Sequence, residues 1–185
     1  FGSITSLGSL THIATQTASS SASLSFTSGI DSTYKEYIFY FVNMHPASDK
    51  VYFTFQGSTD SGSNYNTTAT TTNFSAYHFE SDSATELAYR SSDDQAQSTN
   101  FINIAQRVGS GNDESISGFL HLFNPSSTTF VKHFISRTST YNADDILFDV
   151  YNAGYFNTTS AIDAVSFKMA SGNIDSGQIL LFGLN

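Results

Sequence analysis

Apolar and polar residues alternate at every second position along most of this chain, the spacing that turns one face of a β-strand toward a core. In residues 50–56, Val51, Phe53 and Phe55 share one face and predict a half-buried strand. The run EYIFYFV, residues 36–42, is apolar on both faces and predicts a central strand that is covered on both sides. The same alternation predicts further strands within residues 22–28, 101–108, 114–124, 128–137, 144–155, 161–169 and 178–184.

Three segments follow the alternation less closely. Residues 65–79 are rich in Thr and lack a strong apolar face, which predicts an edge strand. Residues 80–99 predict a long excursion from the sheets, with a short helix or a short strand at residues 87–90. Residues 1–20 are rich in Ser and Thr and form either a strand at residues 10–16 or an arm that reaches a neighbouring molecule.

Together these segments predict an all-β protein with one main domain at residues 21–185, preceded by the N-terminal strand or arm of residues 1–20. Many short strands between turns, without a helical period or a repeat of fixed length, are typical of an antiparallel β-sandwich of the jelly-roll kind. The 17 Phe and 10 Tyr predict that its core is rich in aromatic rings.

Charge and composition narrow the classes of partner. The 16 acidic residues outnumber the 7 basic ones and give a formal charge of −9, which disfavours nucleic acid and anionic membrane surfaces as partners. No apolar run reaches the roughly 20 residues that a membrane-spanning helix needs. The chain contains no Cys, so disulfides, zinc–thiolate sites and cysteine nucleophiles are excluded.

No motif designates a catalytic group or a cofactor site. The patterns GxSxG, GxGxxG and GxxxxGK[ST] are absent, and the five His are spread singly, without the spacing of a metal site. We therefore expect a protein that is not an enzyme and that holds no cofactor or metal. Calcium is the alternative, because the loop DSGSN at residues 60–64 clusters oxygen-bearing side chains, although it lacks the bidentate Glu of a calcium loop.

Two groups of residues are candidates for ligand contact. Acidic pairs in the predicted loops could supply calcium oxygens or, together with Glu80 and Glu86, the carboxylate pair of a glycosidase, whereas the simpler interpretation is solvated loop acids. These pairs are Asp93 with Asp94 and Asp144 with Asp145. Tyr side chains in loops could stack on sugar rings, whereas most aromatic residues of a sandwich fill its core or rim. The Tyr candidates are Tyr34, Tyr65, Tyr77 and Tyr141.

Three phrases of the sequence carry a family resemblance. SFTSGIDSTYKEYIF, FTFQGSTDSGSNYN and the closing SGNIDSGQILLFGLN together resemble virion proteins of tailed phages, including marine phages. Those proteins share a turn before a long strand and a closing hairpin, and the ending Leu184–Asn185 departs from their frequent basic or polar tail. The matching positions here are Gly29, Ile30 and Tyr34 for the turn, and Gly172, Ile174, Gly177, Ile179 and Gly183 for the hairpin.

The resemblance implies a jelly-roll subunit on the virion exterior, as a head decoration or a tail appendage, and usually an oligomer. We therefore expect a non-enzymatic structural protein at the virion surface that assembles with copies of itself and docks on a capsid or tail protein. The alternative is a module that binds carbohydrate or a host receptor through the candidate Tyr and Asp residues. A hydrolase of the sandwich type would require two carboxylates about 5 to 10 Å apart in a cleft.

Overall fold

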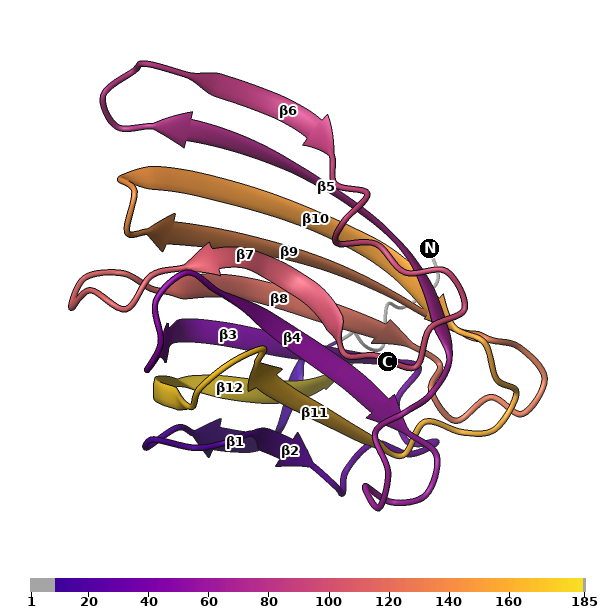
Figure 1. Cartoon of the computed structure of the whole chain (residues 1–185). Helices are drawn as coiled ribbons and strands as arrows, with labels where there is room; N and C mark the ends of the chain where they lie inside the picture. Colours follow the sequence, from indigo (N-terminus) through magenta and orange to yellow (C-terminus); the bar gives the residue numbers. More distant parts are fainter. Residues whose placement is uncertain (1–8, 185) are drawn as a thin grey trace, which may run out of the picture.

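The computed structural model describes residues 9–184, which form twelve β-strands and no helix (Figure 1). No helix that could cross a membrane therefore occurs in this part of the chain. The strands are β1 (Thr11–Thr17), β2 (Leu24–Phe26), β3 (Glu36–Pro46), β4 (Val51–Ser58), β5 (Ala69–Phe79), β6 (Thr85–Tyr89), β7 (Ile102–Val108), β8 (Ile116–Phe123), β9 (Lys132–Asn142), β10 (Ile146–Phe156), β11 (Ala164–Met169) and β12 (Ile174–Leu184).

The strands form two antiparallel sheets that pack as a sandwich, which confirms the predicted fold class. The larger sheet has eight strands in the order β1-β12-β3-β8-β9-β10-β5-β6, and the smaller has four in the order β2-β11-β4-β7. Strands β1, β12, β3 and β8 and the four strands of the small sheet follow the connectivity of a jelly roll. In this pattern consecutive strands such as β1 and β2, β3 and β4, or β11 and β12 belong to opposite sheets.

The remaining four strands are two hairpins inserted into the jelly roll. One hairpin, β5–β6, is inserted between β4 and β7, and the other, β9–β10, between β8 and β11. Both add to the same edge of the large sheet and extend it in the order β9-β10-β5-β6. We call these four strands the wing; Figure 1 shows its outer part extending past β7, the last strand of the small sheet. Its inner face is turned toward β7, and its outer face is on the opposite side of the sheet.

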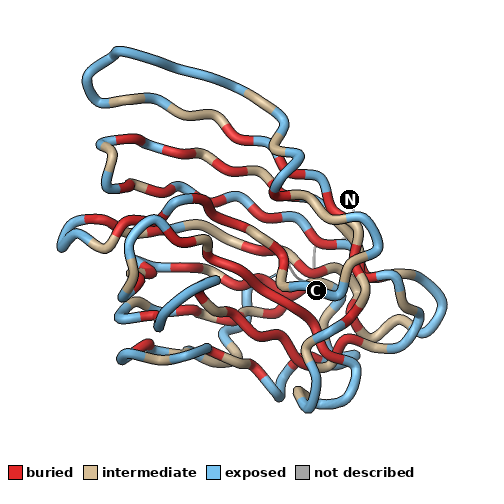
Figure 2. Tube along the Cα trace, in the orientation of Figure 1, coloured by how far each residue is buried: buried red, intermediate tan, exposed pale blue. Residues whose placement is uncertain are grey.

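The core between the sheets is a cluster of aromatic rings. Phe167 of β11 lies at its centre and is fully buried. Its ring centroid is 5.2 Å from that of Phe39 and 5.3 Å from that of Phe41, and it stacks at 6.0 Å on Phe53. Buried residues concentrate between the two sheets in Figure 2, where the alternating Phe rows of β3 and β4 meet, as the sequence predicts.

Two expectations about individual strands are wrong. The outer side of β3 is not covered throughout, because Ile38 is buried by its neighbours while Val42 is exposed. Residues 69–79 are not an edge strand, since β5 pairs with β10 along its whole length and with β6 on its other side. The edge strand on this side of the large sheet is β6. Of the two alternatives for residues 87–90, the short strand is therefore correct and the short helix is wrong.

The polar inner side of β5, β9 and β10 has a structural cause. Strand β7 ends the small sheet, so its outward carbonyl groups have no neighbouring strand to bond. Thr138 Oγ1 donates to the carbonyl of Ile104 at 2.6 Å, and the side-chain amides of Asn73 and Asn152 donate to the carbonyl of Asn103 at 3.3 and 3.2 Å. Buried hydroxyl and amide groups of the wing therefore satisfy the edge of the small sheet.

At the N-terminal end, residues Thr11–Thr17 form strand β1, which pairs with β12. Of the two alternatives for residues 1–20, the structure thus shows a strand for this portion. Residues 1–8, which would complete the arm, lie outside the described residues.

Candidate functional site

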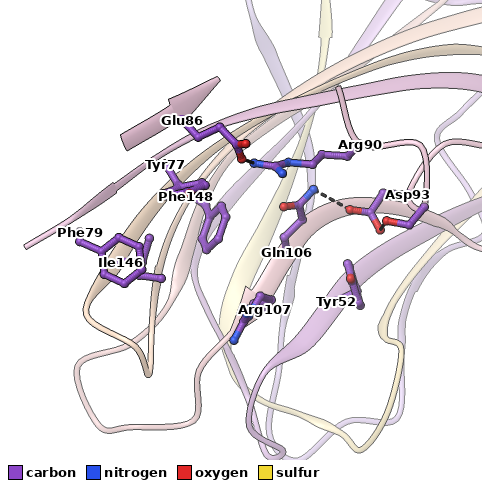
Figure 3. Close-up of a pocket in the computed structure, with 11 residues that line it drawn as sticks. Tyr52, Tyr77, Phe79, Glu86, Arg90, Asp93, Gln106, Arg107, Ile146 and Phe148 are labelled. Carbon is purple, nitrogen blue, oxygen red and sulfur yellow. Dashed lines mark hydrogen bonds and ion pairs between the residues drawn. The ribbon is translucent and has the colours of Figure 1, made fainter. Parts of the chain in front are cut away.

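A groove runs between strand β7 and the inner face of the wing (Figure 3). It encloses about 360 Å³, and we call it the wing groove. Ligand sites are usually concave and combine apolar walls with a few fixed polar groups, and this groove has both. It is lined by Tyr52, Tyr77, Phe79, Glu86, Arg90, Ser92, Asp93, Gln106, Arg107, Ile146 and Phe148.

The apolar side of the wing groove comes from β5 and β10. Strand register pairs Phe148 with Tyr77 and Ile146 with Phe79, so that the four side chains share the inner face. The ring of Tyr77 lies 5.6 Å from that of Phe148 and 5.8 Å from that of Phe79. Tyr77 and Phe79 remain half-exposed, so their rings offer an apolar surface to a ligand in the groove.

Arg90 provides the polar side of the groove next to this surface. Its Nη2 donates to Glu86 Oε2 at 2.8 Å, and its Nε donates to Ser75 Oγ at 2.8 Å. Its guanidinium carbon also lies 5.7 Å from the centroid of the Tyr77 ring. Three contacts thus fix one side chain, and the ion pair with Glu86 neutralises its charge.

A β-bulge in β7 supplies the opposite wall. Val108 pairs with Val51 and Ala105 with Phe53, so Gln106 and Arg107 together face the single residue Tyr52. Such a bulge redirects side chains, and all three of these residues line the groove. Arg107 has a φ of +50°, a left-handed conformation that is uncommon for residues other than Gly.

Asp93 connects the bulge to the loop after β6. Gln106 Nε2 donates to Asp93 Oδ2 at 2.6 Å, and the side chain of Asp93 is only 5% exposed. Burial raises the pKa of Asp93 above its ordinary value of 3.8, and burial, together with the nearby Asp93 carboxylate, raises the pKa of Tyr52. Gln106 also accepts from Ser75 Oγ at 3.4 Å, so hydrogen bonds link Glu86, Arg90 and Asp93 across the groove.

We predict that Asp93→Asn increases the free energy of unfolding at neutral pH. Because the pKa of Asp93 is raised on folding, the native protein binds more protons than the unfolded chain between 3.8 and the raised value. The contribution of Asp93 to stability therefore falls as pH rises through that window, whereas Asn carries no charge and still accepts from Gln106. Urea unfolding at several pH values should show the advantage of the variant disappearing below pH 3.8; an equal difference at every pH would contradict the prediction.

The structure brings together two of the residues proposed for ligand contact, Tyr77 and Asp93, in the wing groove. Asp144 lies beside it, because it accepts from Arg107 Nη2 at 2.6 Å and from Lys50 Nζ at 2.6 Å. These two cations lower the pKa of Asp144, Lys50 being the larger cause.

The other candidates lie outside the groove. Tyr34 packs edge-on against Tyr37, and Tyr65 lies near Gly62 in the loop after β4. Tyr141 donates to Asp145, a contact that raises the pKa of Tyr141 to about 12. Asp94 accepts a hydrogen bond from Tyr89.

Eight lining residues were not predicted, namely Tyr52, Phe79, Arg90, Ser92, Gln106, Arg107, Ile146 and Phe148. Arg90 is the only basic residue of the segment 80–99, a signal that could have identified it. The bulge that places Gln106 and Arg107 leaves no mark on the alternation of apolar residues.

The loop at residues 60–64 uses its oxygens internally. Asp60 accepts from Ser58 Oγ at 2.7 Å, from the backbone N–H of Asn64 at 2.9 Å and from the Asn64 side-chain amide at 2.7 Å. These hydrogen bonds, the Asn64 amide first, lower the pKa of Asp60 to about 2. Among residues 9–184 no group of three or more His, Cys, Asp or Glu side chains is arranged to hold a metal ion.

The wing groove therefore combines ring faces with donors and acceptors whose positions are fixed by one another. Both Arg side chains of the groove are paired with carboxylates, Arg90 with Glu86 and Arg107 with Asp144, so neither is left to bind an anion. The remaining donors and acceptors suit a ligand that carries many hydroxyl groups. Comparison with protein-family models, with curated proteins and with solved structures gave no match.

Proposed function

We propose that this chain is a non-enzymatic binding protein whose wing groove takes a neutral carbohydrate. The observation that carries the proposal is the half-exposed ring of Tyr77 beside the Glu86–Arg90 ion pair. A sugar ring has an apolar face, which can stack on an aromatic ring, and an edge of hydroxyls, which can bond to charged and amide groups. A volume of about 360 Å³ is at the small end for ligand pockets and suits a short saccharide.

The absence of catalysis is part of the proposal, and it is supported by how the two groove carboxylates are used. Glu86 is held by Arg90, and Asp93 is held by Gln106. Glycosidases keep one carboxyl protonated as an acid and a second free to attack or to activate water. With both groups bonded to neighbours, binding is the role that the geometry favours.

The proposed setting is the exterior of a phage virion, as a head decoration or a tail appendage. It is supported by the sequence resemblance and by the jelly-roll connectivity, which viral capsid and lectin domains both use. A saccharide site at this position would serve to bind a host surface polysaccharide.

A glycan array with labelled wild-type protein tests the carbohydrate proposal. We expect selective binding to neutral saccharides and about tenfold weaker binding for Tyr77→Ala, because the variant loses the stacking surface. Tyr155→Ala is the matched control, since Tyr155 is a half-exposed Tyr on the outer face of β10 and should retain wild-type affinity. Failure to bind any saccharide, or equal losses in both variants, would contradict the proposal.

The second candidate is a purely structural subunit that assembles with its own copies and docks on a capsid or tail protein. A formal charge of −9 suits docking on a basic surface. The specific observation in its favour is the apolar outer face of the wing.

A further inference from the structure

We propose that the outer face of the wing is the contact surface of a two-fold symmetric dimer of this chain. The inference rests on the assembly role named as the second candidate above and does not depend on saccharide binding in the wing groove. It gives that role a surface, a symmetry and individual contact residues.

The outer face of the wing departs from the usual rule for a sandwich. The inner face carries buried polar groups beside its apolar cluster, whereas on the outer face large apolar side chains are exposed to solvent. Leu87 is 71% exposed and Tyr89 is 56% exposed, both on β6. The other exposed apolar side chains of this face are Phe74, Ile135 and Leu147. Exposed large apolar side chains that gather on one sheet face are typical of a protein contact site.

The centre of the patch is held by stacked rings and an ion pair. The rings of Phe74 and Tyr151 stack with centroids 4.8 Å apart and planes at 3°. Arg137 lies 4.8 Å from the centroid of the Tyr151 ring and makes two hydrogen bonds to Asp149, at 2.9 and 2.8 Å. Because this Arg is already paired, the surface can be covered without leaving an isolated charge.

The patch also contains a protrusion and a hollow. Leu87 and Tyr89 protrude on the edge strand β6. A hollow of about 400 Å³ is centred on β9. It is lined by Ser117, Gly118, Phe119, Arg137, Ser139, Leu147 and Asp149.

Strand register places the protrusion and the hollow in the same cross-strand rows. The row of Leu87 continues through Ala76 and Asp149 to Ser139. The row of Tyr89 continues through Phe74 and Tyr151 to Arg137. The protrusion and the hollow therefore lie at the same position along the strand direction. Across the sheet they are separated by three strand spacings, roughly 14 Å.

This arrangement is self-complementary. The midpoint between β6 and β9 falls between β5 and β10, where Phe74 and Tyr151 stack. A two-fold axis parallel to the strands at that point would place β6 of each copy over β9 of the other. Leu87 of each copy would then enter the hollow of the other copy. A second copy therefore fits this face in a way that an unrelated flat partner would not.

The face is also large enough. The four strands of the wing, three of 11 residues and one of 5, at a spacing of about 4.8 Å and about 3.3 Å per residue give roughly 600 Å² of sheet face. Two copies that cover this face on each other would bury roughly 1,200 Å² in total, which is the lower end of the range for specific protein–protein interfaces.

Sedimentation velocity across a concentration series tests the inference. We expect wild-type protein to form a dimer, and Leu87→Glu to raise its dissociation constant about tenfold or more because each contact would bury an unpaired carboxylate. Ser139→Trp, which fills the hollow, should have a similar effect. Leu10→Glu is the matched control, because Leu10 is an exposed Leu before β1, at the far edge of the same sheet. The dissociation constant of the Leu10→Glu dimer should equal that of the wild-type protein.

Thermal melts of the four proteins separate loss of contact from loss of fold, since a folded Leu87→Glu monomer is the expected result. A dimer that neither Leu87→Glu nor Ser139→Trp weakens would overturn this surface while leaving homotypic assembly intact. A wild-type protein that stays monomeric throughout would overturn both. In that case retention of wild-type protein on an insoluble polysaccharide, lost in Phe74→Ala, would assign the face to that ligand instead.

Discussion

Phe167→Ala should lower the free energy of unfolding by about 4 kcal/mol, the largest change we expect from any single substitution in this chain. Phe167 is fully buried, and besides Phe39, Phe41 and Phe53 its ring lies within 6.1 Å of Phe55 and 6.3 Å of Phe26. Truncation would remove the apolar area of one ring and leave a cavity that these surrounding rings cannot collapse to fill. Urea denaturation followed by Tyr fluorescence measures the loss.

Phe130→Ala is the control for this prediction. Phe130 is 69% exposed in the connection between β8 and β9, so its removal should change the free energy of unfolding by no more than about 0.5 kcal/mol. A loss below about 2 kcal/mol for Phe167→Ala would mean that the two sheets do not meet at this ring.

The position of Phe167 is the kind of feature that alternation predicts well. Val165, Phe167 and Met169 share a phase in the sequence, and all three are buried. The same rule placed Phe53 and Phe55 correctly, because each belongs to a strand of the jelly roll whose inner face meets another apolar face.

In the wing the rule holds for β10, where Ile146, Phe148 and Val150 are buried in phase, but it fails in β9. In β9 the inner positions include Lys132, Thr138 and Thr140, while Ile135 is turned to the outer face. Lys132 donates to the carbonyls of Phe130 and Thr158. Thr138 instead takes an inner position because it donates to the edge of β7, at a residue 34 positions away in the chain. No local window of sequence contains that information.

The candidate site was predictable only as separate residues. Tyr77 and Asp93 were identified singly, but their proximity depends on the pairing of β5 with β10 and on the bulge in β7. Arg90 was missed since its role depends on β6, a five-residue strand whose position follows only from its pairing with β5. Sequence patterns thus identify side chains with suitable chemistry, while insertions into the jelly roll determine which of them meet.

Arg90→Ala should weaken saccharide binding about 30-fold, or about 2 kcal/mol, more than any other substitution in the wing groove. Arg90 holds Glu86 and Ser75 and lies over Tyr77, so its loss removes a donor, releases a carboxylate and frees the stacking ring. Arg90→Lys should recover little, because an ammonium group cannot hold Glu86 and Ser75 in the fork geometry of a guanidinium. Titration calorimetry with a saccharide selected on the array gives the affinities.

Arg137 provides the matched comparison, since it repeats the arrangement of Arg90 on the other face of the wing. It is bonded to Asp149 and lies over Tyr151, just as Arg90 is bonded to Glu86 and lies over Tyr77. Arg137→Ala should therefore weaken the dimer and leave saccharide binding unchanged, while Arg90→Ala should do the reverse. If both variants weakened both activities, the two faces of the wing would not act independently, because disturbing either Arg would then deform the sheet that they share.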